Sequence, residues 1–373
     1  MKIALICNEY PPHPHGGIGT FVHDFAHALD GAGHQVFVFG VRDQAESYSD
    51  GRIQVQMIGG RKIRYISWLT RRMPFWRFLR KQVKALGIDV VETTDFMGLI
   101  PVDIGCPVVV RLHQTATGLA KYKGQKPKLS NIWFEQRQLR SHPAWIAMSE
   151  HALALTLALF PRVKPARTAI IHPPLDLPPP APSIGDISEN FVLHVGYVEP
   201  TKGAVAVAEA AVRFLREDPS LELVYAGTIL SKDGVPVDQI IRDIVGPELA
   251  RRIHFLGWVK RDLVVALMAK ARMFLFPSQL ETFGLVAAEA MLQGCPVVVS
   301  DYGPFLEFVR HEETGLIIDP KDTDALAEAA IRLLRDPGFA RTLGKNGQDY
   351  ISSNFSRARH LQETLAFYEE VSR

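Results

Sequence analysis

Two carboxylates near the C-terminal end of this 373-residue chain, those of Glu281 and Glu289, stand eight residues apart among small and apolar residues. We expect a strand over Met273–Phe276 to end before Glu281, and a helix to begin between the two acids. The first N–H groups of such a helix lack partners within the helix and attract anions. These donors would be those of Phe283, Gly284 and Leu285. An isolated pair of acids is also typical of a solvated helix face, but the apolar flanks of Glu289 favour a ligand site that could hold a diphosphate.

Lys202 and His113 are two further candidates for chemistry. Lys202 stands at the start of an expected helix, where a cation opposes the helix dipole, so a bound anion explains it better than an ordinary surface position. His113 follows the expected strand Val108–Leu112. A lone histidine is more often a hydrogen-bonded core residue, and only its place at the end of a strand favours a functional role. His13 and His15 lie among prolines and are interpreted as loop residues.

The elements that must position these groups form a twice-repeated alternation of strands and helices. This pattern predicts parallel sheets wrapped by helices, and a chain of this length exceeds the size at which single cores stop growing. Six prolines in residues 173–186 indicate a stiff linker between the halves. We expect an N-terminal domain at 1–175, a linker at 176–186, a C-terminal domain at 187–355 and a helix at 356–373 that docks on an apolar surface. The expected strands are Ile3–Cys7, Gln35–Phe39, Ile53–Ile58, Val90–Glu92, Val108–Leu112, Trp145–Met148, Phe191–Val195, Leu221–Tyr225, Ile253–Leu256, Met273–Phe276, Val297–Ser300 and Leu316–Ile318.

The composition narrows the class of protein. Cys7, Cys106 and Cys295 are scattered and odd in number, which indicates a reducing, cytoplasmic compartment and neither a structural disulfide nor a zinc site. No stretch approaches the ~20 apolar residues of a membrane span. The apolar run at the N-terminus is too short for a signal peptide and is interpreted as a first strand.

The charge is unevenly distributed between the halves. Residues 1–180 hold 22 basic and 13 acidic side chains, a net charge of +9, whereas the remainder holds 20 and 27, a net charge of −7. Much of the positive charge lies in residues 61–84, together with Trp68, Phe75, Trp76 and Phe78. Basic residues among aromatics suit an anionic acceptor or peripheral contact with the anionic inner face of the plasma membrane. The alternative is a solvated connecting helix whose aromatics belong to the core. We expect no nucleic-acid partner, because no nucleic-acid motif accompanies the patch.

Several motifs, in order along most of the chain, resemble the retaining GT-B glycosyltransferases of carbohydrate-active family 4. The most specific is the stretch around Glu281 and Glu289. Residues 11–19 resemble the family's glycine-rich loop after the first strand, and Val110–His113 resembles its strand ending in histidine. The remaining matches are Gly196 with Lys202 and Gly203, Gly303 with Glu307, and Thr314 to Leu316. The resemblance implies two Rossmann-like parallel-sheet domains facing a deep cleft, with a C-terminal helix that crosses back to the N-terminal domain.

The resemblance also implies a role for each matching residue. Glu289 would bind the ribose of a nucleotide, Lys202 would neutralise the diphosphate, and Glu281 would orient the transferred sugar. His113 would contact that sugar and help position the acceptor. The remaining donor-binding residues would be Gly16 and Gly17 over the phosphates, Tyr197 beside them, and Val259 in a loop lining the base.

The implied reaction transfers a hexosyl group from a nucleotide sugar to an acceptor hydroxyl with retention of configuration. UDP-sugars are the first expectation and GDP-sugars the second, with a carbohydrate or lipid-linked acceptor in cell-surface polysaccharide or glycolipid synthesis. Lysine and a helix N-terminus can stabilise the departing diphosphate without a metal, so no metal or other cofactor is expected.

One departure from the family pattern leaves two alternatives open. Tyr197 stands where an arginine is usual, so one of two phosphate-binding cations is missing. Such a change also suits a catalytically silent binding partner, and a GT-B sugar-nucleotide epimerase is a further alternative. An NAD-dependent oxidoreductase is disfavoured, because Val22 replaces the third glycine of its fingerprint and no acid ends the second strand.

Overall fold

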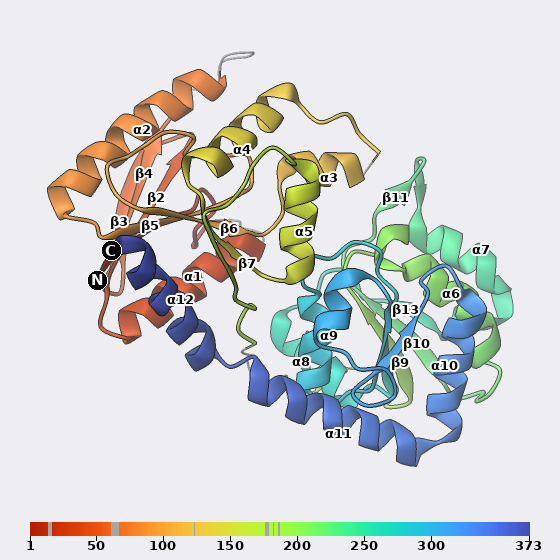
Figure 1. The fold of residues 1–373 in the computed structure, drawn as a ribbon. Helices are drawn as coiled ribbons and strands as arrows, with labels where there is room; N and C mark the ends of the chain where they lie inside the picture. The colour runs from red at the N-terminus through yellow and green to blue at the C-terminus, as the bar shows by residue number, and fades with distance from the viewer. Residues whose placement is uncertain (14–16, 61–66, 123, 176–178, 182, 186) are drawn as a thin grey trace. The chain divides into compact units, whose positions relative to one another are not determined.

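The computed structural model divides the chain into two compact units, described separately below (Figure 1). The first unit comprises Met1–His172 and Arg357–Arg373, and the second comprises Pro173–Ser356. The structure describes residues 1–13, 17–60, 67–122, 124–175, 179–181, 183–185 and 187–373. The predicted α/β fold class, with two parallel-sheet domains, is confirmed.

The first unit is built on an eight-stranded sheet in the order β3-β4-β2-β1-β5-β6-β7-β8. All neighbours are parallel except β3 and β4, which pair antiparallel. The central strands are continuous runs of buried apolar residues, as parallel strands covered on both faces must be. The strands are β1 (Lys2–Ile6), β2 (Gln35–Arg42), β3 (Glu46–Asp50), β4 (Ile53–Gly59), β5 (Val90–Thr94), β6 (Val108–Leu112), β7 (Ala144–Ala147) and β8 (Arg167–Ile170).

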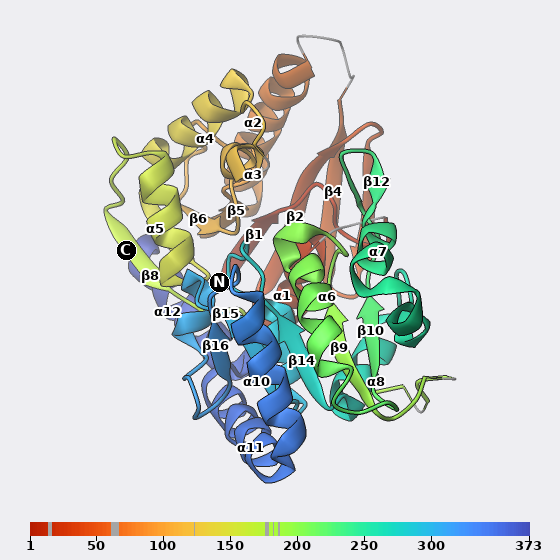
Figure 2. The ribbon, with the colours of Figure 1, turned by 90° about the vertical axis from the view of Figure 1, so that its right-hand side faces the viewer.

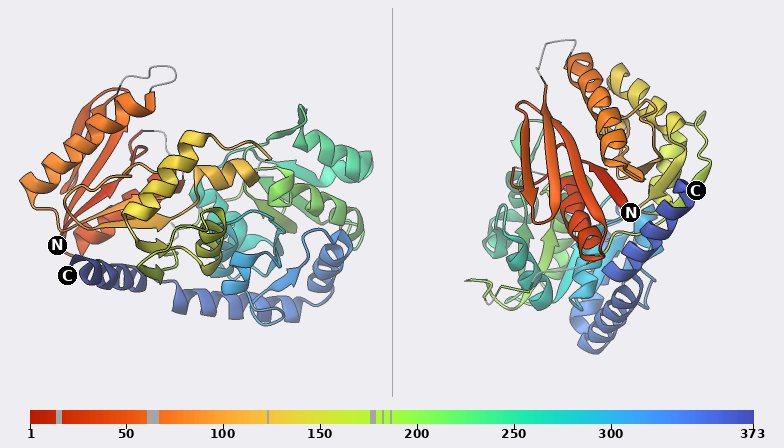
Figure 3. Two further views of the ribbon diagram at one scale, coloured as in Figure 1. Left: turned by 45° about the horizontal axis from the view of Figure 1, so that its top comes forward. Right: turned by 90° about the vertical axis from the view of Figure 1, so that its left-hand side faces the viewer.

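Helices cover both faces of this sheet (Figure 3). Alternate residues of β1 pack on opposite sides of it. Ile3 and Leu5 pack with α1 and α12, whereas Ala4 and Ile6 pack with α2. The helices of this unit are α1 (Gly17–Gly31), α2 (Ser67–Leu86), α3 (Ala116–Tyr122), α4 (Leu129–Ser141), α5 (Glu150–Leu159) and α12 (Arg357–Ser372).

A buried ion pair fixes α12 to the sheet of the first unit. The Arg111 guanidinium on β6 donates to both carboxylate oxygens of Glu92 on β5, at 2.8 and 2.9 Å. The Tyr368 hydroxyl on α12 donates to the same carboxylate at 2.6 Å. All three side chains are almost completely excluded from water. The last helix of the chain is therefore held by polar contacts as well as by the apolar packing of Phe367 and Leu361.

The second unit contains a six-stranded parallel sheet in the order β13-β10-β9-β14-β15-β16 (Figure 2). Its strands are β9 (Phe191–Val195), β10 (Glu222–Ala226), β13 (Ile253–Phe255), β14 (Met273–Phe276), β15 (Val297–Ser300) and β16 (Leu316–Ile318). A separate short hairpin joins β11 (Ser231–Lys232) to β12 (Val235–Pro236). The first strand of the unit, β9, therefore lies in the middle of its sheet, between β10 and β14.

Helices also cover both faces of the second sheet. One core forms between the sheet and α6, α7 and α10, and the other between the sheet and α8 and α9, with the end of α11 packed beside them. Leu175 and Ile184, from the proline-rich segment, are buried in the second of these cores. The elements are η1 (Pro200–Lys202), α6 (Ala204–Phe214), α7 (Val237–Leu249), η2 (Ala250–Arg252), α8 (Arg261–Lys270), α9 (Leu285–Leu292), η3 (Gly303–Glu307), α10 (Thr323–Arg335) and α11 (Pro337–Asn354).

The basic, aromatic segment forms α2 from residue 67 onward, and residues 61–66 lie outside the described part of the chain. Phe75 is buried, and Trp76 and Phe78 pack against the same core, as the alternative interpretation predicted. Arg72 is also buried, with its guanidinium over the Phe134 ring and a hydrogen bond to the Met97 carbonyl. Trp76 and Phe78 are half-buried, and contact of residues 61–84 with a membrane stays a prediction. Within the described residues, no helix is long and apolar enough to span a bilayer.

All twelve strands expected from the sequence are present, with ends shifted by a few residues at most. Three features were not predicted, namely the edge strands β3 and β8 and the β11/β12 hairpin. The sequence of β3, ESYSD, is polar, and its burial pattern alternates only between half-buried and exposed residues. A strand of this kind is held by backbone pairing with β4, which leaves no apolar signature in the sequence.

Replacing Arg111 with leucine should destabilise the first unit by ~3–5 kcal/mol, because Glu92 would stay buried without its cation. Arg167→Ala is the matched control, since Arg167 also contacts α12 but its partner Glu370 is exposed. That variant should lose at most ~1 kcal/mol. Urea denaturation followed by circular dichroism measures both. If both variants lost the same free energy of unfolding, the buried pair would contribute no more to stability than the exposed one.

Candidate functional site

The second unit brings the predicted donor-binding residues to the point where its strand order reverses. The strand β9 pairs with β10 on one side and β14 on the other, so the chain leaves β9 and β14 at neighbouring positions on the carboxyl edge. In open α/β sheets, ligands bind at this place. The two loops are joined directly, because the Gln279 N–H donates to the Thr201 carbonyl at 2.9 Å.

The side chains of Lys202 and Glu281 form an ion pair between these loops. Lys202 Nζ lies 2.6 Å from Glu281 Oε1 and 2.8 Å from the Leu280 carbonyl oxygen. The two side chains are only 18% and 16% exposed. Burial raises the pKa of Glu281, and the charge of Lys202 and a hydrogen bond from Ser278 oppose that shift. Lys202, in the loop after β9, thus contacts Glu281, in the loop after β14. The sequence predicted both residues for one site, and the structure brings them together.

Two glycines in these loops lie so close to neighbouring residues that no side chain would fit. Gly203 has a φ of 82°, and a Cβ there would come within 2.6 Å of the Pro277 carbonyl oxygen. Gly284 has a φ of 88°, and a Cβ there would meet the Phe305 ring at 2.5 Å. Both positions therefore require glycine for conformation and for space.

The helix α9 begins at Leu285, so Glu281 lies before the helix and Glu289 lies within it. Gly284 is the N-cap residue and provides no side-chain cap, which leaves the first N–H groups of the helix without an intrahelical acceptor. Phe283 is buried in the core beside Phe308, so its side chain has a packing role. Leu285 is 38% exposed. The arrangement can bind an anion through backbone donors.

Glu289 has a cationic partner that the sequence did not reveal. Arg261, at the start of α8, places Nη2 2.7 Å from Glu289 Oε1. The Glu289 side chain is 13% exposed and that of Arg261 is 47% exposed. Burial raises the pKa of Glu289, and Arg261 opposes that shift. The two residues are 28 positions apart, and only the packing of α8 beside α9 joins them.

Tyr197 and Val259 lie in the loops after β9 and β13. Tyr197 follows Gly196 at the end of β9 and is 55% exposed. Val259 is half-buried and packs against the core that contains α8 and α9. Its neighbour Trp258 is 76% exposed. The predicted contacts of Tyr197 with phosphate and of Val259 with a base stay predictions.

In the first unit, His113 directly follows β6 and is buried. Its ring packs edge-on against Phe21 of α1, with 5.1 Å between ring centroids, and Nε2 has no hydrogen-bond partner among the described residues. Burial, with Arg111 and His360 nearby, lowers the pKa of His113 to about 3. The imidazole is therefore neutral at ordinary pH and can offer Nε2 to a ligand as a hydrogen-bonding group.

Asp95 was missed by the sequence analysis. It follows β5, next to β6, and its Oδ1 accepts hydrogen bonds from the backbone N–H groups of His113 and Gln114 at 3.0 and 3.1 Å. Its Oδ2 is buried without a partner in the described structure. Burial raises the pKa of Asp95 to about 7. A signal for Asp95 was available in the sequence. It is an acid directly after a buried strand, and the next strand along the chain ends in a histidine.

The glycine-rich loop is described only in part. Gly16 lies outside the described residues, and Gly17 is the first residue of α1. Nearby in the same unit, a pocket of about 630 Å³ opens beside the ends of β1 and β2. It contains the guanidinium groups of Arg42 and Arg71, of which Arg71 pairs with Asp43 at 2.8 Å. The pocket is lined by Asn8, His13, Val41, Arg42, Asp43, Gln44, Ala45, Glu46 and Arg71.

Comparison with known proteins assigns a family to each half of the chain. Residues 15–178 match the family described as Glycosyltransferase Family 4, and residues 185–350 match Glycosyl transferases group 1. The alpha-maltose-1-phosphate synthase of Mycolicibacterium smegmatis is 30% identical over 100% of both chains.

Solved structures agree with this assignment at the level of the fold. The sucrose-phosphate synthase of Thermosynechococcus elongatus has a TM-score of 0.79 and 23% identity, covering 99% of this chain and 98% of its own. Anabaena HepE, solved with UDP and glucose, has a TM-score of 0.76 and 20% identity, covering 99% and 100%.

Asp95→Asn should change how stability depends on pH. A carboxyl whose pKa rises from 3.8 to about 7 on folding contributes stability below pH 4 that is lost as the pH rises through 7. The wild type should therefore lose ~4 kcal/mol relative to Asp95→Asn between pH 4 and pH 8. Urea denaturation at several pH values measures this difference.

Asp218→Asn serves as a control of opposite sign. Hydrogen bonds from Asn190 and Ser220 lower the pKa of Asp218, so its contribution is lost as the pH falls. A stability difference between wild type and Asp95→Asn that stays constant from pH 4 to pH 8 would contradict the raised pKa of Asp95.

Proposed function

We propose that this chain, which belongs to the GT-B glycosyltransferases of the family 4 type, transfers a hexosyl group from a nucleotide sugar to an acceptor hydroxyl with retention of configuration. The family gives the enzyme class, a glycosyltransferase. The observation that carries the finer proposal is the Lys202–Glu281 ion pair at the carboxyl edge between β9 and β14, just before the N-terminus of α9. A cation, a carboxylate and the backbone donors at the start of a helix, when they lie at one place, suit a sugar diphosphate.

Stabilisation of the departing diphosphate is the main catalytic task of this reaction. The bond between the sugar's anomeric carbon and the phosphate oxygen breaks, a bond to the acceptor oxygen forms, and the acceptor proton passes to a donor phosphate oxygen. Lys202 and the first N–H groups of α9 would hold the developing negative charge. They are fixed before the substrate binds, because Lys202 is already tied to Leu280 and Glu281. No metal is required by this scheme.

The carboxylates have binding roles in the proposal. Glu281 would accept hydrogen bonds from hydroxyls of the transferred sugar, and a donor phosphate would draw Lys202 into a shared contact. Glu289, held by Arg261, would accept hydrogen bonds from the ribose. Neutral His113 would contribute a hydrogen bond rather than a charge. These roles separate the two acids, so they do not act as a general acid and base couple.

A UDP-sugar is the proposed donor, and an anionic molecule is the proposed acceptor. The first is supported by the solved structure of Anabaena HepE with UDP-glucose, which shares this fold. The second is supported by the net positive charge of residues 1–180. A lipid-linked or otherwise phosphorylated acceptor in cell-surface polysaccharide or glycolipid synthesis would fit.

Thermal-shift measurements with UDP, GDP and ADP test the donor proposal. We expect UDP to raise the melting temperature most, because a ligand that binds only the folded state stabilises it. Incubation with UDP-hexoses and NMR of the product would then show transfer or slow hydrolysis, with the anomeric configuration retained. Conversion of the sugar without cleavage would indicate an epimerase, and nucleotide binding without any turnover would indicate a silent binding partner. No shift with any nucleotide would overturn the donor assignment.

Lys202→Ala should lower kcat for transfer or hydrolysis by about 10²–10³-fold, the usual cost of removing one group that stabilises the transition-state anion. The matched control is Lys270→Ala in the same unit. Lys270 also pairs with a glutamate at 2.7 Å, but both partners are exposed. Steady-state kinetics compare the two, and a similar effect of both substitutions would remove Lys202 from the proposed mechanism.

A further inference from the structure

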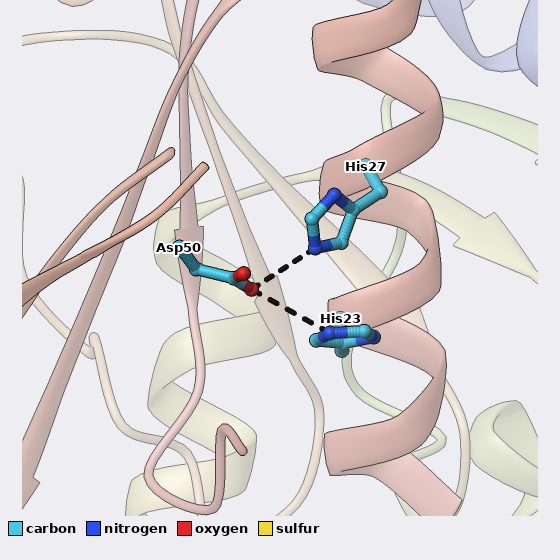
Figure 4. A group of neighbouring side chains, drawn as sticks. All are labelled: His23, His27 and Asp50. Atoms are coloured by element: carbon cyan, nitrogen blue, oxygen red, sulfur yellow. Dashed lines mark hydrogen bonds and ion pairs between the residues drawn. The ribbon is translucent and has the colours of Figure 1, made fainter. Parts of the chain in front are cut away.

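Two histidines and one aspartate form a cluster in the first unit that the proposed transfer reaction does not use. His23 and His27 lie one turn apart on the same face of α1, and Asp50 is the last residue of β3 (Figure 4). Asp50 Oδ2 lies 3.0 Å from His27 Nε2 and 3.5 Å from His23 Nε2. The three atoms all lie within 4.8 Å of one another.

Neighbouring side chains contact the two imidazoles and the carboxylate of this cluster and orient them. His23 Nδ1 lies 3.0 Å from Asp24 Oδ1, an arrangement in which a carboxylate fixes the ring and leaves Nε2 to a ligand. The Tyr10 hydroxyl donates to Asp50 Oδ2 at 2.9 Å. The imidazole rings of His23 and His27 have centroids 4.6 Å apart. The cluster therefore has outer contacts of the kind that orient metal ligands in proteins.

Protons alone satisfy this cluster poorly. Asp50 Oδ2 receives Tyr10 Oη and His27 Nε2 within 3.0 Å, and His23 Nε2 approaches the same oxygen. With its Nδ1 proton directed to Asp24, the imidazole of His23 presents the Nε2 lone pair to the Asp50 carboxylate 3.5 Å away. One cation held by both imidazoles and the carboxylate would satisfy these facing lone pairs and would replace the Nε2 proton of His27. Tyr10 could then keep its own hydrogen bond.

We propose that His23, His27 and Asp50 bind a divalent transition metal of the zinc class, with water completing the coordination. Neutral imidazole nitrogen and carboxylate oxygen are ligands that Zn²⁺ accepts in a tetrahedral site. Bonds of about 2.0–2.1 Å place tetrahedral ligand atoms about 3.3 Å apart, which is close to the separations in this cluster. The side chains are 30–39% exposed, so an ion and a water molecule can enter.

The metal would join α1 to the edge of the sheet. The strand β3 pairs only with β4 among the described strands, and His23 and His27 belong to the helix whose Phe21 packs against His113. The proposed site is separate in its residues from the predicted donor site, and it would stabilise the first unit whether or not the transfer proposal holds. The predicted independence of catalysis from metal concerns the diphosphate and is unaffected.

Binding of Zn²⁺ to chelator-treated full-length protein tests the proposal. We expect one equivalent of zinc by isothermal titration calorimetry, with affinity at least about tenfold weaker in His23→Gln, His27→Gln and Asp50→Asn. His254→Gln is the matched control, because His254 pairs with the single carboxylate of Glu222 at 3.2 Å and lies outside the cluster. The control should bind zinc as the wild type does. Equal affinity in the wild type and the cluster variants would overturn the proposal.

Cobalt substitution keeps the test independent of variant folding. Co²⁺ bound to the wild type should give the intense visible absorption of a four-coordinate site, whereas loosely bound, hydrated Co²⁺ absorbs weakly. Zinc should displace the signal and raise the melting temperature, and a chelator should reverse both. A weak spectrum of hydrated Co²⁺, or no spectral change, would overturn the proposed coordination without reference to any variant.

Discussion

The ion pair between Lys202 and Glu281 joins the loops that follow β9 and β14, and the geometry of the proposed donor site depends on it. Each charge is largely removed from water, so each needs the other to remain ionised at low cost. The contact is possible only because β9 and β14 are neighbours in the sheet. Gly203 then allows the loop after β9 to approach Pro277 of the loop after β14 without a side chain between them.

The first unit uses the same physical constraint for a different purpose. Arg111 and Glu92 are completely or almost completely buried, and Tyr368 joins them from the last helix. Arg111 and Tyr368 both donate to the Glu92 carboxylate, and these hydrogen bonds hold α12 on the sheet. Asp95 and His113, at the same edge of the sheet, each keep one buried polar atom without a partner in the described structure. Buried groups left in this way are expected where a ligand supplies the missing contact.

Much of this arrangement could be predicted from sequence. The residues that could not be predicted were missed for one common reason. The strands around β9 and β14 were predicted because continuous apolar runs identify buried parallel strands. Glu281, Glu289, Lys202 and His113 were identified because motif order indicated a family. Arg261 and Asp95 were missed, since neither lies in a distinctive motif and each meets its partner only through packing. The aromatic residues of α2 had two interpretations, and the structure places Phe75 in the core, as one of them predicted.

The sequence by itself determined the alternation of strands and helices, the family and the residue types of the donor site, because these follow from local periodicity and from motifs within short segments. The tertiary structure decided which charges meet. Lys202 and Glu281 are 79 residues apart, Arg261 and Glu289 are 28 apart, and His27 and Asp50 are 23 apart. Such pairs depend on strand order and helix packing, which are set by burial of the whole apolar surface rather than by the residues that form the contact.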